Sequence, residues 1–299
     1  MGALTGEYRC PVAAIRDAIW DDFDAVFALL DARSRAAFGI SEQKPEFLRQ
    51  RWGLPGGGRW VAVEDRAVVG YVGLDEDQAV AHAAVDPEVG DALFAHAEHQ
   101  ARSRGFDHVS VTAVPEDVPL YGAVQRNGYT LEREVLRMWR QLNGDLPEPA
   151  WPEGIAVLSY EDADGERVHA LLDEAYSGWD RDYVARSHEG WLSFMTRHDD
   201  FDPALWFLVE RDGELLACAL HWKENQRRGW VKDIVVRESE RGAGLGKALL
   251  QHAFRAYAER GVDRVGLKVG STNPTGAPQL YERVGFEIDQ RLGIWQKRL

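Results

Sequence analysis

Residues 237–250 read RESERGAGLGKALL, in which three glycines alternate with single residues before the sequence becomes apolar. Glycine is unfavourable inside a helix or strand, so such a cluster marks backbone that turns sharply or lies close to another group. Apolar residues then recur three and four positions apart from Leu245 to Tyr257, which predicts a helix over about 245–260. The β-branched segment WVKDIVV at 230–236 predicts a strand before the loop. The glycines therefore join a strand to the N-terminus of a helix.

A strand that runs into a glycine-rich turn and a helix is a potential anion site. The first N–H groups of a helix have no internal partners, and the helix dipole adds partial positive charge there. With Arg241 and Lys247 at its sides, the loop predicts a phosphate-binding site. Nucleoside triphosphate loops require Ser or Thr after the lysine, whereas Ala248 follows Lys247. Dinucleotide loops require a third glycine at the position of Lys247. Nucleoside triphosphates and dinucleotides therefore fit this loop poorly. Coenzyme A is the third class of ligand that such loops bind.

Composition limits the class of protein and its partners. At 299 residues, with 45% hydrophobic and 28% charged residues, the chain can form one large globular domain or two ordinary ones. A formal net charge of −14 argues against nucleic acid or an anionic membrane as a partner and is compatible with a cationic amine. The N-terminus lacks a signal-peptide pattern, no apolar run could span a bilayer, and only two cysteines are present. These features predict a cytoplasmic protein. No metal site is predicted, because an exposed helical face explains His96 and His99.

The two halves of the chain resemble each other. LFAHAEHQARSRGFDHVSVTAV at 93–114 matches LLQHAFRAYAERGVDRVGLKVG at 249–270, and the residues identical at one constant offset include Leu93, His96, Gly105 and Asp107. Between the halves, the prolines and acidic residues of NGDLPEPAWPEG indicate a linker. We interpret the chain as two copies of one fold, with a first domain at 1–143, a linker at 144–154 and a second domain at 155–299.

The pattern of the second half predicts an α+β fold. The turn Arg211-Asp212-Gly213 indicates a hairpin, and Gly261 indicates the end of a helix. The order of elements gives a mainly antiparallel sheet with one strand–helix–strand crossover. The expected strands are about 155–160, 205–210, 215–222, 230–236, 263–269 and 293–299, and the expected helices are about 167–176, 245–260 and 275–284.

The glycine loop also resembles a family motif. Residues 241–246, Arg-Gly-Ala-Gly-Leu-Gly, are similar to the R/Q-x-x-G-x-G/A signature of the GNAT superfamily of acyl-CoA N-acyltransferases. A second marker of that family follows at the usual distance, as Asn273 and then LYERVGF at 280–286. Asn273 and Tyr281 are eight residues apart rather than the usual seven, so the segment between them absorbs one residue. The resemblance covers the whole second half and, more faintly, the first. It implies αβα layers and two tandem GNAT-like domains, each a mixed, mainly antiparallel sheet flanked by helices.

The resemblance implies acetyl-CoA as a co-substrate and no metal. The loop N–H groups would hold the pyrophosphate, the strand at 234–236 would pair with the pantetheine arm, and Asn273 would contact that arm or the gap beside the strand. Tyr281 would donate a proton to the departing thiolate; packing on the sheet is its alternative role. The residues implied to bind acetyl-CoA are Ile234, Val235, Val236, Arg241, Gly242, Ala243, Gly244, Leu245, Gly246, Lys247 and Asn273.

The attacking amine is mostly protonated at neutral pH, so some group must accept its proton. One tandem-domain relative carries a glutamate on this strand, but Trp230 stands at that position here. Asp233 is the nearest carboxylate and becomes the candidate base, with a plain surface charge as its alternative. Lys232, His221 and ordered water are the other candidates, and His221 can equally be structural.

An aromatic and acidic region around residues 179–202 corresponds to the part of the family fold that lines the acceptor pocket. We therefore expect Trp179, Tyr183 and His221 to bind a cationic or polyhydroxylated amine. A solvated pair of helices is the alternative reading of this segment.

The first half departs from the family at the decisive positions. Its loop is five residues shorter and reads DPEVGD, in which Asp86, Glu88 and Asp91 would repel a pyrophosphate. Val124 stands where the second half has Tyr281. We predict a degenerate copy that packs against the catalytic one.

Together these features predict an N-acetyltransferase that transfers the acetyl group of acetyl-CoA to a primary amine of a small molecule, by direct attack in a ternary complex. The alternatives are a protein N-terminus or lysine as the acceptor, and a non-catalytic acyl-CoA-binding sensor. The protein is expected to be a monomer or a homodimer.

Overall fold

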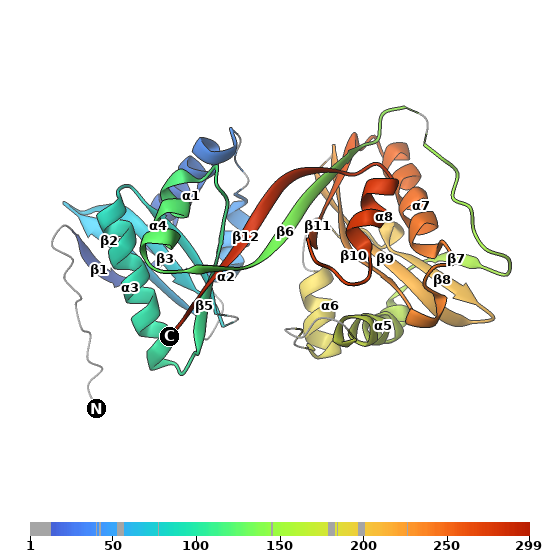
Figure 1. Cartoon of the computed structure of the whole chain (residues 1–299), viewed down its shortest axis with the longest axis horizontal. Coiled ribbons are helices and arrows are strands. Elements are labelled where there is room, and N and C mark those ends of the chain that lie inside the picture. The colour runs from blue at the N-terminus through green and yellow to red at the C-terminus, as the bar shows by residue number, and fades with distance from the viewer. Residues whose placement is uncertain are drawn as a thin grey trace. The chain divides into compact units, whose positions relative to one another are not determined.

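The computed structural model describes residues 13–299 except residues 40, 42, 53–56, 77, 145, 179–182, 184, 197–200 and 226. The chain forms two compact units (Figure 1), one of Met1–Val135 with Arg291–Leu299 and one of Leu136–Gln290. No helix in the described part of the chain has the length and apolar character needed to span a bilayer.

The first unit is built on a mixed sheet. Strands β1 to β4 pair antiparallel in sequence order, whereas β4 and β5, which α3 connects, pair in parallel. Its elements are β1 (Ala14–Asp17), α1 (Phe23–Phe38), α2 (Pro45–Trp52), β2 (Gly58–Glu64), β3 (Ala67–Leu74), β4 (Ala79–Ala84), α3 (Pro87–Ser103), β5 (His108–Ala113), α4 (Val118–Arg126) and the first part of β6 (Thr130–Gln141).

The second unit repeats this order of helices and strands, which confirms the α+β fold predicted for two copies. Strands β7 to β10 pair antiparallel in sequence order, and β10 pairs in parallel with β11. Its elements are β7 (Ala156–Ser159), α5 (Gly165–Ser177), α6 (His188–Thr196), β8 (Phe207–Arg211), β9 (Glu214–Asn225), β10 (Arg228–Val236), α7 (Leu245–Glu259), β11 (Arg264–Gly270), α8 (Ala277–Arg283) and the first part of β12 (Glu287–Arg298).

Most of these helices and strands were predicted from local sequence patterns. The predicted turn between β8 and β9 is a two-residue hairpin loop, in which Asp212 and Gly213 have φ angles of 52° and 82°. Positive φ at both central residues matches the twist of the flanking strands, and glycine adopts it without steric cost. The helix α6, which the sequence pattern did not predict, places Trp191 and Met195 in the core.

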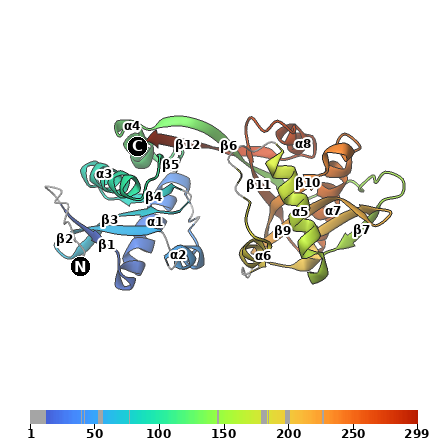
Figure 2. The ribbon, with the colours of Figure 1, turned by 90° about the horizontal axis from the view of Figure 1, so that it is seen from below.

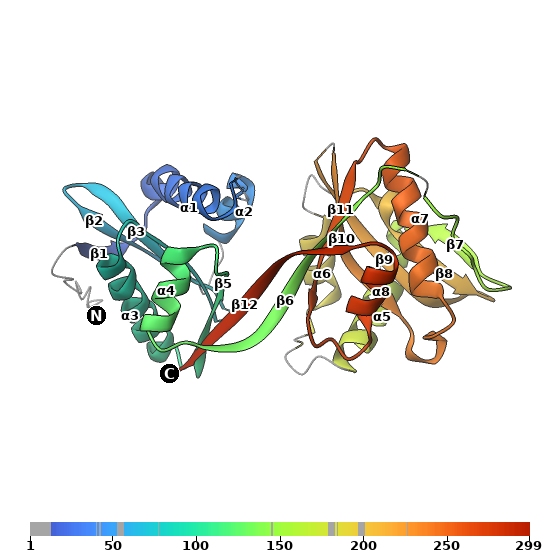
Figure 3. The same ribbon diagram turned by 45° about the horizontal axis from the view of Figure 1, so that its top comes forward.

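Helices cover both faces of the sheet in the second unit (Figure 2, Figure 3). One face carries a core formed with α7 and α8, which includes Val231 and Leu249. The other face carries a core formed with α5 and α6, which includes Leu172 and Val235. The two cores give the second unit the expected αβα layers.

The last strand of each half divides between the units. Gly293–Arg298 of β12 pairs antiparallel with β5 in the first unit, while β6 from Leu136 onward belongs to the second. The sequence boundaries at 143 and 155 therefore differ from the division that the contacts give. The segment predicted as a linker contributes Leu146 and Trp151 to the packing of the core that the second unit forms with α7 and α8. A hydrophobic pattern identifies a strand but not the sheet edge with which it pairs, so this exchange could not be read from the sequence.

Candidate active site

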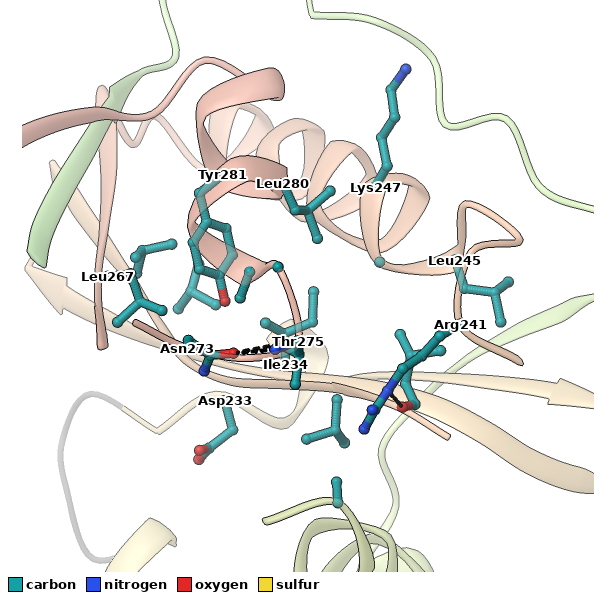
Figure 4. A pocket seen from close by; sticks show the side chains of 18 of the residues that line it. Asp233, Ile234, Arg241, Leu245, Lys247, Leu267, Asn273, Thr275, Leu280 and Tyr281 are labelled. Carbon is teal, nitrogen blue, oxygen red and sulfur yellow. Dashed lines mark hydrogen bonds between the residues drawn. The ribbon is translucent and has the colours of Figure 1, made fainter. Parts of the chain in front are cut away.

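A pocket of about 540 Å³ lies in the second unit, between β10, β11, α7, α8 and the end of α5 (Figure 4). Its lining brings together both predicted catalytic residues, Tyr281 and Asp233. It also includes ten of the residues predicted to bind acetyl-CoA: Ile234, Val235, Val236, Arg241, Gly242, Gly244, Leu245, Gly246, Lys247 and Asn273. Ala243 does not line it.

The pocket opens where two parallel strands separate. The pairing of β10 with β11 covers only Arg228–Trp230 and Arg264–Gly266, after which both strands line the pocket. The continuing strand β10 remains paired with β9 as far as Val236. The gap therefore lies in the sheet itself, and an extended ligand could pair with the backbone of β10 as an added strand.

The glycine loop forms one end of this pocket. Gly242 and Gly244 have φ angles of 84° and 88°, a left-handed conformation that side chains disfavour. Gly246 lies close to α8, where an added Cβ would stand 3.1 Å from Cδ2 of Leu280. The loop thus has two left-handed turns followed by a close approach of two helices.

The N-terminus of α7 is left without a side-chain cap, because Gly244 occupies the capping position. Its first N–H groups and the helix dipole favour an anion at the pocket. Arg241 lies beside it, and its Nε donates to the carbonyl of Val236 at 3.3 Å. Figure 4 shows the Lys247 side chain pointing away from the pocket, so its contribution there is its backbone. This arrangement fits the pyrophosphate of coenzyme A.

Tyr281 enters the pocket from α8, with its hydroxyl pointing toward β10 (Figure 4). The side chain is 6% exposed and packs edge-on against Phe286, with ring centroids 5.7 Å apart. Burial, and then the negative charge of Asp233, raise the pKa of this phenol. The group therefore keeps its proton at neutral pH and can act as a donor.

Asp233 leaves β10 on the side opposite Tyr281 (Figure 4). Its Oδ1 accepts a hydrogen bond of 2.6 Å from the hydroxyl of Tyr176, and its Oδ2 lies 3.3 Å from Nζ of Lys232. The Asp233 side chain is 11% exposed. It is thus a partly buried carboxylate with a defined donor, unlike a plain surface charge.

Asn273 holds the loop that follows β11. Its Oδ1 accepts hydrogen bonds from the backbone N–H of Thr275 at 2.9 Å and from the Thr275 hydroxyl at 2.6 Å. Gly276 then starts α8, which carries Tyr281. The observed hydrogen bonds of Asn273 therefore position the start of the helix that bears the tyrosine.

Two of the residues predicted to bind the acceptor, Tyr183 and His221, do not line the pocket. His221 is fully buried, with its ring between Phe207 and Tyr257, and burial lowers its pKa to about 3. Tyr183 lies next to the pocket, where its ring stacks on Tyr176 with centroids 5.4 Å apart. Trp179 lies outside the described residues.

One residue of the site, Tyr176 from α5, was missed from the sequence. Lys232, which the sequence analysis named among the candidate bases, is an extra residue in β10 at which the pairing with β9 shifts. Trp230 does not line the pocket, and its ring instead packs edge-on against Trp139. No local pattern marks Tyr176, because its contact with Asp233 joins residues 57 positions apart.

The corresponding helix start in the first unit has a different construction. Asp86 caps α3 through a hydrogen bond of 2.9 Å from the N–H of Val89, and Pro87 occupies the first turn. Val124, opposite Tyr281 in the repeat, is fully buried in the core. The first unit thus has a carboxylate at the helix end where the second has bare backbone. In the described part of the chain, no group of three or more His, Cys, Asp or Glu side chains could hold a metal.

Known proteins resemble this chain in both sequence and fold. Residues 166–286 match the model of the acetyltransferase (GNAT) family. The chain is 31% identical over 290 residues to a mycothiol acetyltransferase of Streptomyces coelicolor, with 88% of this chain and 87% of that protein covered. A GCN5-related N-acetyltransferase structure from Sphaerobacter thermophilus has a TM-score of 0.77 and 26% identity, over 95% of each chain. A tandem GNAT protein from the clavulanic acid biosynthesis pathway has the same fold, with a TM-score of 0.73 and 19% identity over 96% of this chain and 97% of that one. With similarity along nearly its whole length, the chain belongs to the GNAT family of acetyl-CoA-dependent N-acetyltransferases, in its tandem-domain form.

Proposed function

We propose that the second unit transfers the acetyl group of acetyl-CoA to a primary amine of a small molecule, with both substrates bound at once. The observation that carries this proposal is that the uncapped N-terminus of α7, the separated strands, Tyr281 and Asp233 meet in one pocket. The helix end would hold the pyrophosphate, and the edge of β10 would pair with the pantetheine arm. Asp233 would accept a proton from the amine, and Tyr281 would donate one to the thiolate.

Direct attack by the amine is supported by the chemistry of the described residues. Cys218 is fully buried and does not line the pocket. Burial, and then the charge of Asp233, raise the pKa of its thiol, so it is not the thiolate that nucleophilic catalysis requires. A tightly held amine next to the thioester needs no covalent acyl-enzyme, because orientation alone lowers the barrier by several kcal/mol.

A small acceptor is supported by the relatives, which are named as mycothiol acetyltransferases. The carboxylate of Asp233, near the aromatic rings of Tyr176 and Tyr183, provides a setting suited to an ammonium group. We further propose, from the cysteine usage, that the reaction takes place in the cytoplasm.

The test is a panel of amines with release of free coenzyme A as the readout. The panel should contain the acceptor of mycothiol acetyltransferases, amino sugars, polyamines, amino acids and peptides with free N-termini or lysines. We expect turnover with a small amine and much slower turnover in Tyr281→Phe. Preference for the peptides would transfer the assignment to a protein acceptor. Binding of acetyl-CoA without release of free coenzyme A in the presence of any acceptor would favour the sensor.

A further inference from the structure

The β-bulge in β10 decides which way Asp233 points. Val231 pairs with His221, but Asp233 pairs with Leu220, so β10 contains one extra residue, Lys232. Positions 231 and 235 of a regular strand would face the same side. Here Val231 packs with the α7 core and Val235 with the α5 core. The extra residue therefore turns this part of β10 over and presents Asp233 to α5.

Tyr176 meets Asp233 from the last turn of α5. Its hydroxyl donates to Oδ1 at 2.6 Å, and the ring packs against the core on this side of the sheet. Burial, and then the charge of Asp233, raise the pKa of Tyr176 well above its ordinary value. The phenol thus remains a donor, and Oδ1 has a fixed partner. The ring of Tyr183 stacks on the ring of Tyr176, and the Tyr183 hydroxyl donates a hydrogen bond to Asp173.

The second oxygen of Asp233 is held less firmly. Oδ2 lies 3.3 Å from the ammonium of Lys232, whose side chain is 28% exposed, compared with 11% for Asp233. That ammonium also lies 5.7 Å from the ring centre of Trp222. Oδ2 therefore already contacts a cation of the kind that an acceptor amine brings, on a flexible side chain that can move aside.

We propose that Tyr176 is a positioning residue for acetyl transfer: it holds the Asp233 carboxylate through Oδ1 and leaves Oδ2 to take a proton from the acceptor amine. This inference rests on the proposed function, since it takes Asp233 as the proton acceptor. Tyr176 itself acts only through Asp233.

The proton balance follows from this geometry. The acceptor ammonium loses one proton to Oδ2, and the freed nitrogen lone pair forms the C–N bond to the thioester carbonyl carbon. As the C–S bond breaks, Tyr281 donates its proton to the thiolate. The nitrogen loses a second proton, and this proton restores the Tyr281 hydroxyl. The products are the amide, free coenzyme A and one proton released to solvent from Asp233.

The test compares two tyrosines of the same cluster. Tyr176→Phe removes the hydrogen bond to the charged Oδ1, so it should move the acid limb of the kcat/KM profile upward by about one pH unit. Tyr183→Phe removes a hydroxyl from the stacked ring but leaves Asp233 untouched, so its acid limb should stay in place. Besides the two tyrosines, the groups that face Asp233 are Lys232, Cys218 and Tyr281, and both variants retain them.

A double-mutant cycle with Asp233→Asn separates positioning from simple packing. The proposal predicts that Tyr176→Phe has almost no further effect on kcat once Asp233 is replaced, whereas a packing role would lower kcat by the same factor in both backgrounds. Thermal melting and acetyl-CoA binding verify that each variant is folded. An unmoved acid limb in Tyr176→Phe, or equal effects in both backgrounds, would overturn the inference. A parent protein that acetylates no amine would instead overturn the proposed function.

Discussion

The carboxylate of Asp86 accepts a hydrogen bond of 2.9 Å from the backbone N–H of Val89 and so places a negative charge at the start of α3. In the repeat, the start of α7 has Gly244, with no side chain at all. The same helix end therefore repels phosphate in one unit and attracts it in the other.

This contrast predicts one acetyl-CoA site per chain. We expect isothermal titration calorimetry to give a stoichiometry of one, because the Asp86 carboxylate already occupies the N–H of Val89 at the start of α3 and Pro87 has no N–H to offer a phosphate. Two equivalents per chain would contradict the proposed degeneracy of the first unit.

A carboxylate introduced at the start of α7 should weaken the acetyl-CoA site of the second unit. Gly244→Asp would add a carboxylate at the start of α7, and we expect acetyl-CoA binding to weaken by at least about tenfold relative to Gly244→Asn. The asparagine variant is the matched control, because it imposes similar strain at a φ of 88° without the charge. Equal affinities in the two variants would mean that shape, rather than charge, governs the loop.

The role of Tyr281 predicts a loss confined to turnover. Tyr281→Phe removes the donor but keeps the ring, so kcat should fall about 10²–10³-fold, in the lower part of the range for acid–base groups, while acetyl-CoA binding changes by less than about twofold. The raised pKa of this phenol means that it stays protonated below its ordinary value near 10 and loses its proton only above that. A fall in kcat below pH 9 on the alkaline side of the profile, if it disappeared in Tyr281→Phe, would contradict the raised pKa of Tyr281.

The C-terminal strand should stabilise the first unit. Nζ of Lys297 lies 2.8 Å from both oxygens of Glu98, whose side chain is buried on α3. Lys297→Met should cost at most about 3 kcal/mol, since the lysine is partly exposed and Arg102 remains 3.8 Å from the same carboxylate. The double variant Glu98→Gln/Lys297→Met should recover much of this loss, as measured by urea unfolding. Additive losses would show that the pair does not interact.

The exchange of strands also predicts the behaviour of fragments. A fragment of residues 1–143 lacks Gly293–Arg298, the partner of β5, and exposes that strand edge. We expect it to aggregate, and a version with residues 291–299 attached through a flexible linker to be more soluble. A well-folded monomer of residues 1–143 alone would contradict this role of β12.

Features that depend on nearby residues could be predicted from the sequence, and features that depend on distant pairing could not. The left-handed turns at Gly242 and Gly244 follow from three glycines before a helix, and the doubling follows from repeated residues at one offset. The contact of Tyr176 with Asp233 depends on a one-residue bulge at Lys232, which alternation of residue types does not reveal. The core position of His221 depends on packing against Tyr257, so the sequence alone left its role open.

The burial of His221 predicts a specific loss of stability in acid. Its pKa is about 3 in the folded chain, whereas an exposed histidine of the unfolded chain has the ordinary value of 6.5, so the unfolded chain binds more protons between these values. The stabilising contribution of the neutral ring is complete above pH 6.5 and is lost as the pH falls from there toward 3. His221→Leu should therefore reduce the loss of stability between pH 7 and pH 4 by on the order of 3 kcal/mol.

A core variant without a titratable group provides the control. Phe207 packs against His221 with ring centroids 5.7 Å apart, and Phe207→Leu should lower stability by a similar amount at every pH. Urea unfolding followed by tryptophan fluorescence at pH 4, 5, 6 and 7 measures both slopes. If His221→Leu kept the parent slope, the acid sensitivity would have to come from other buried groups, with His82, whose pKa burial lowers to about 4, as the first to replace.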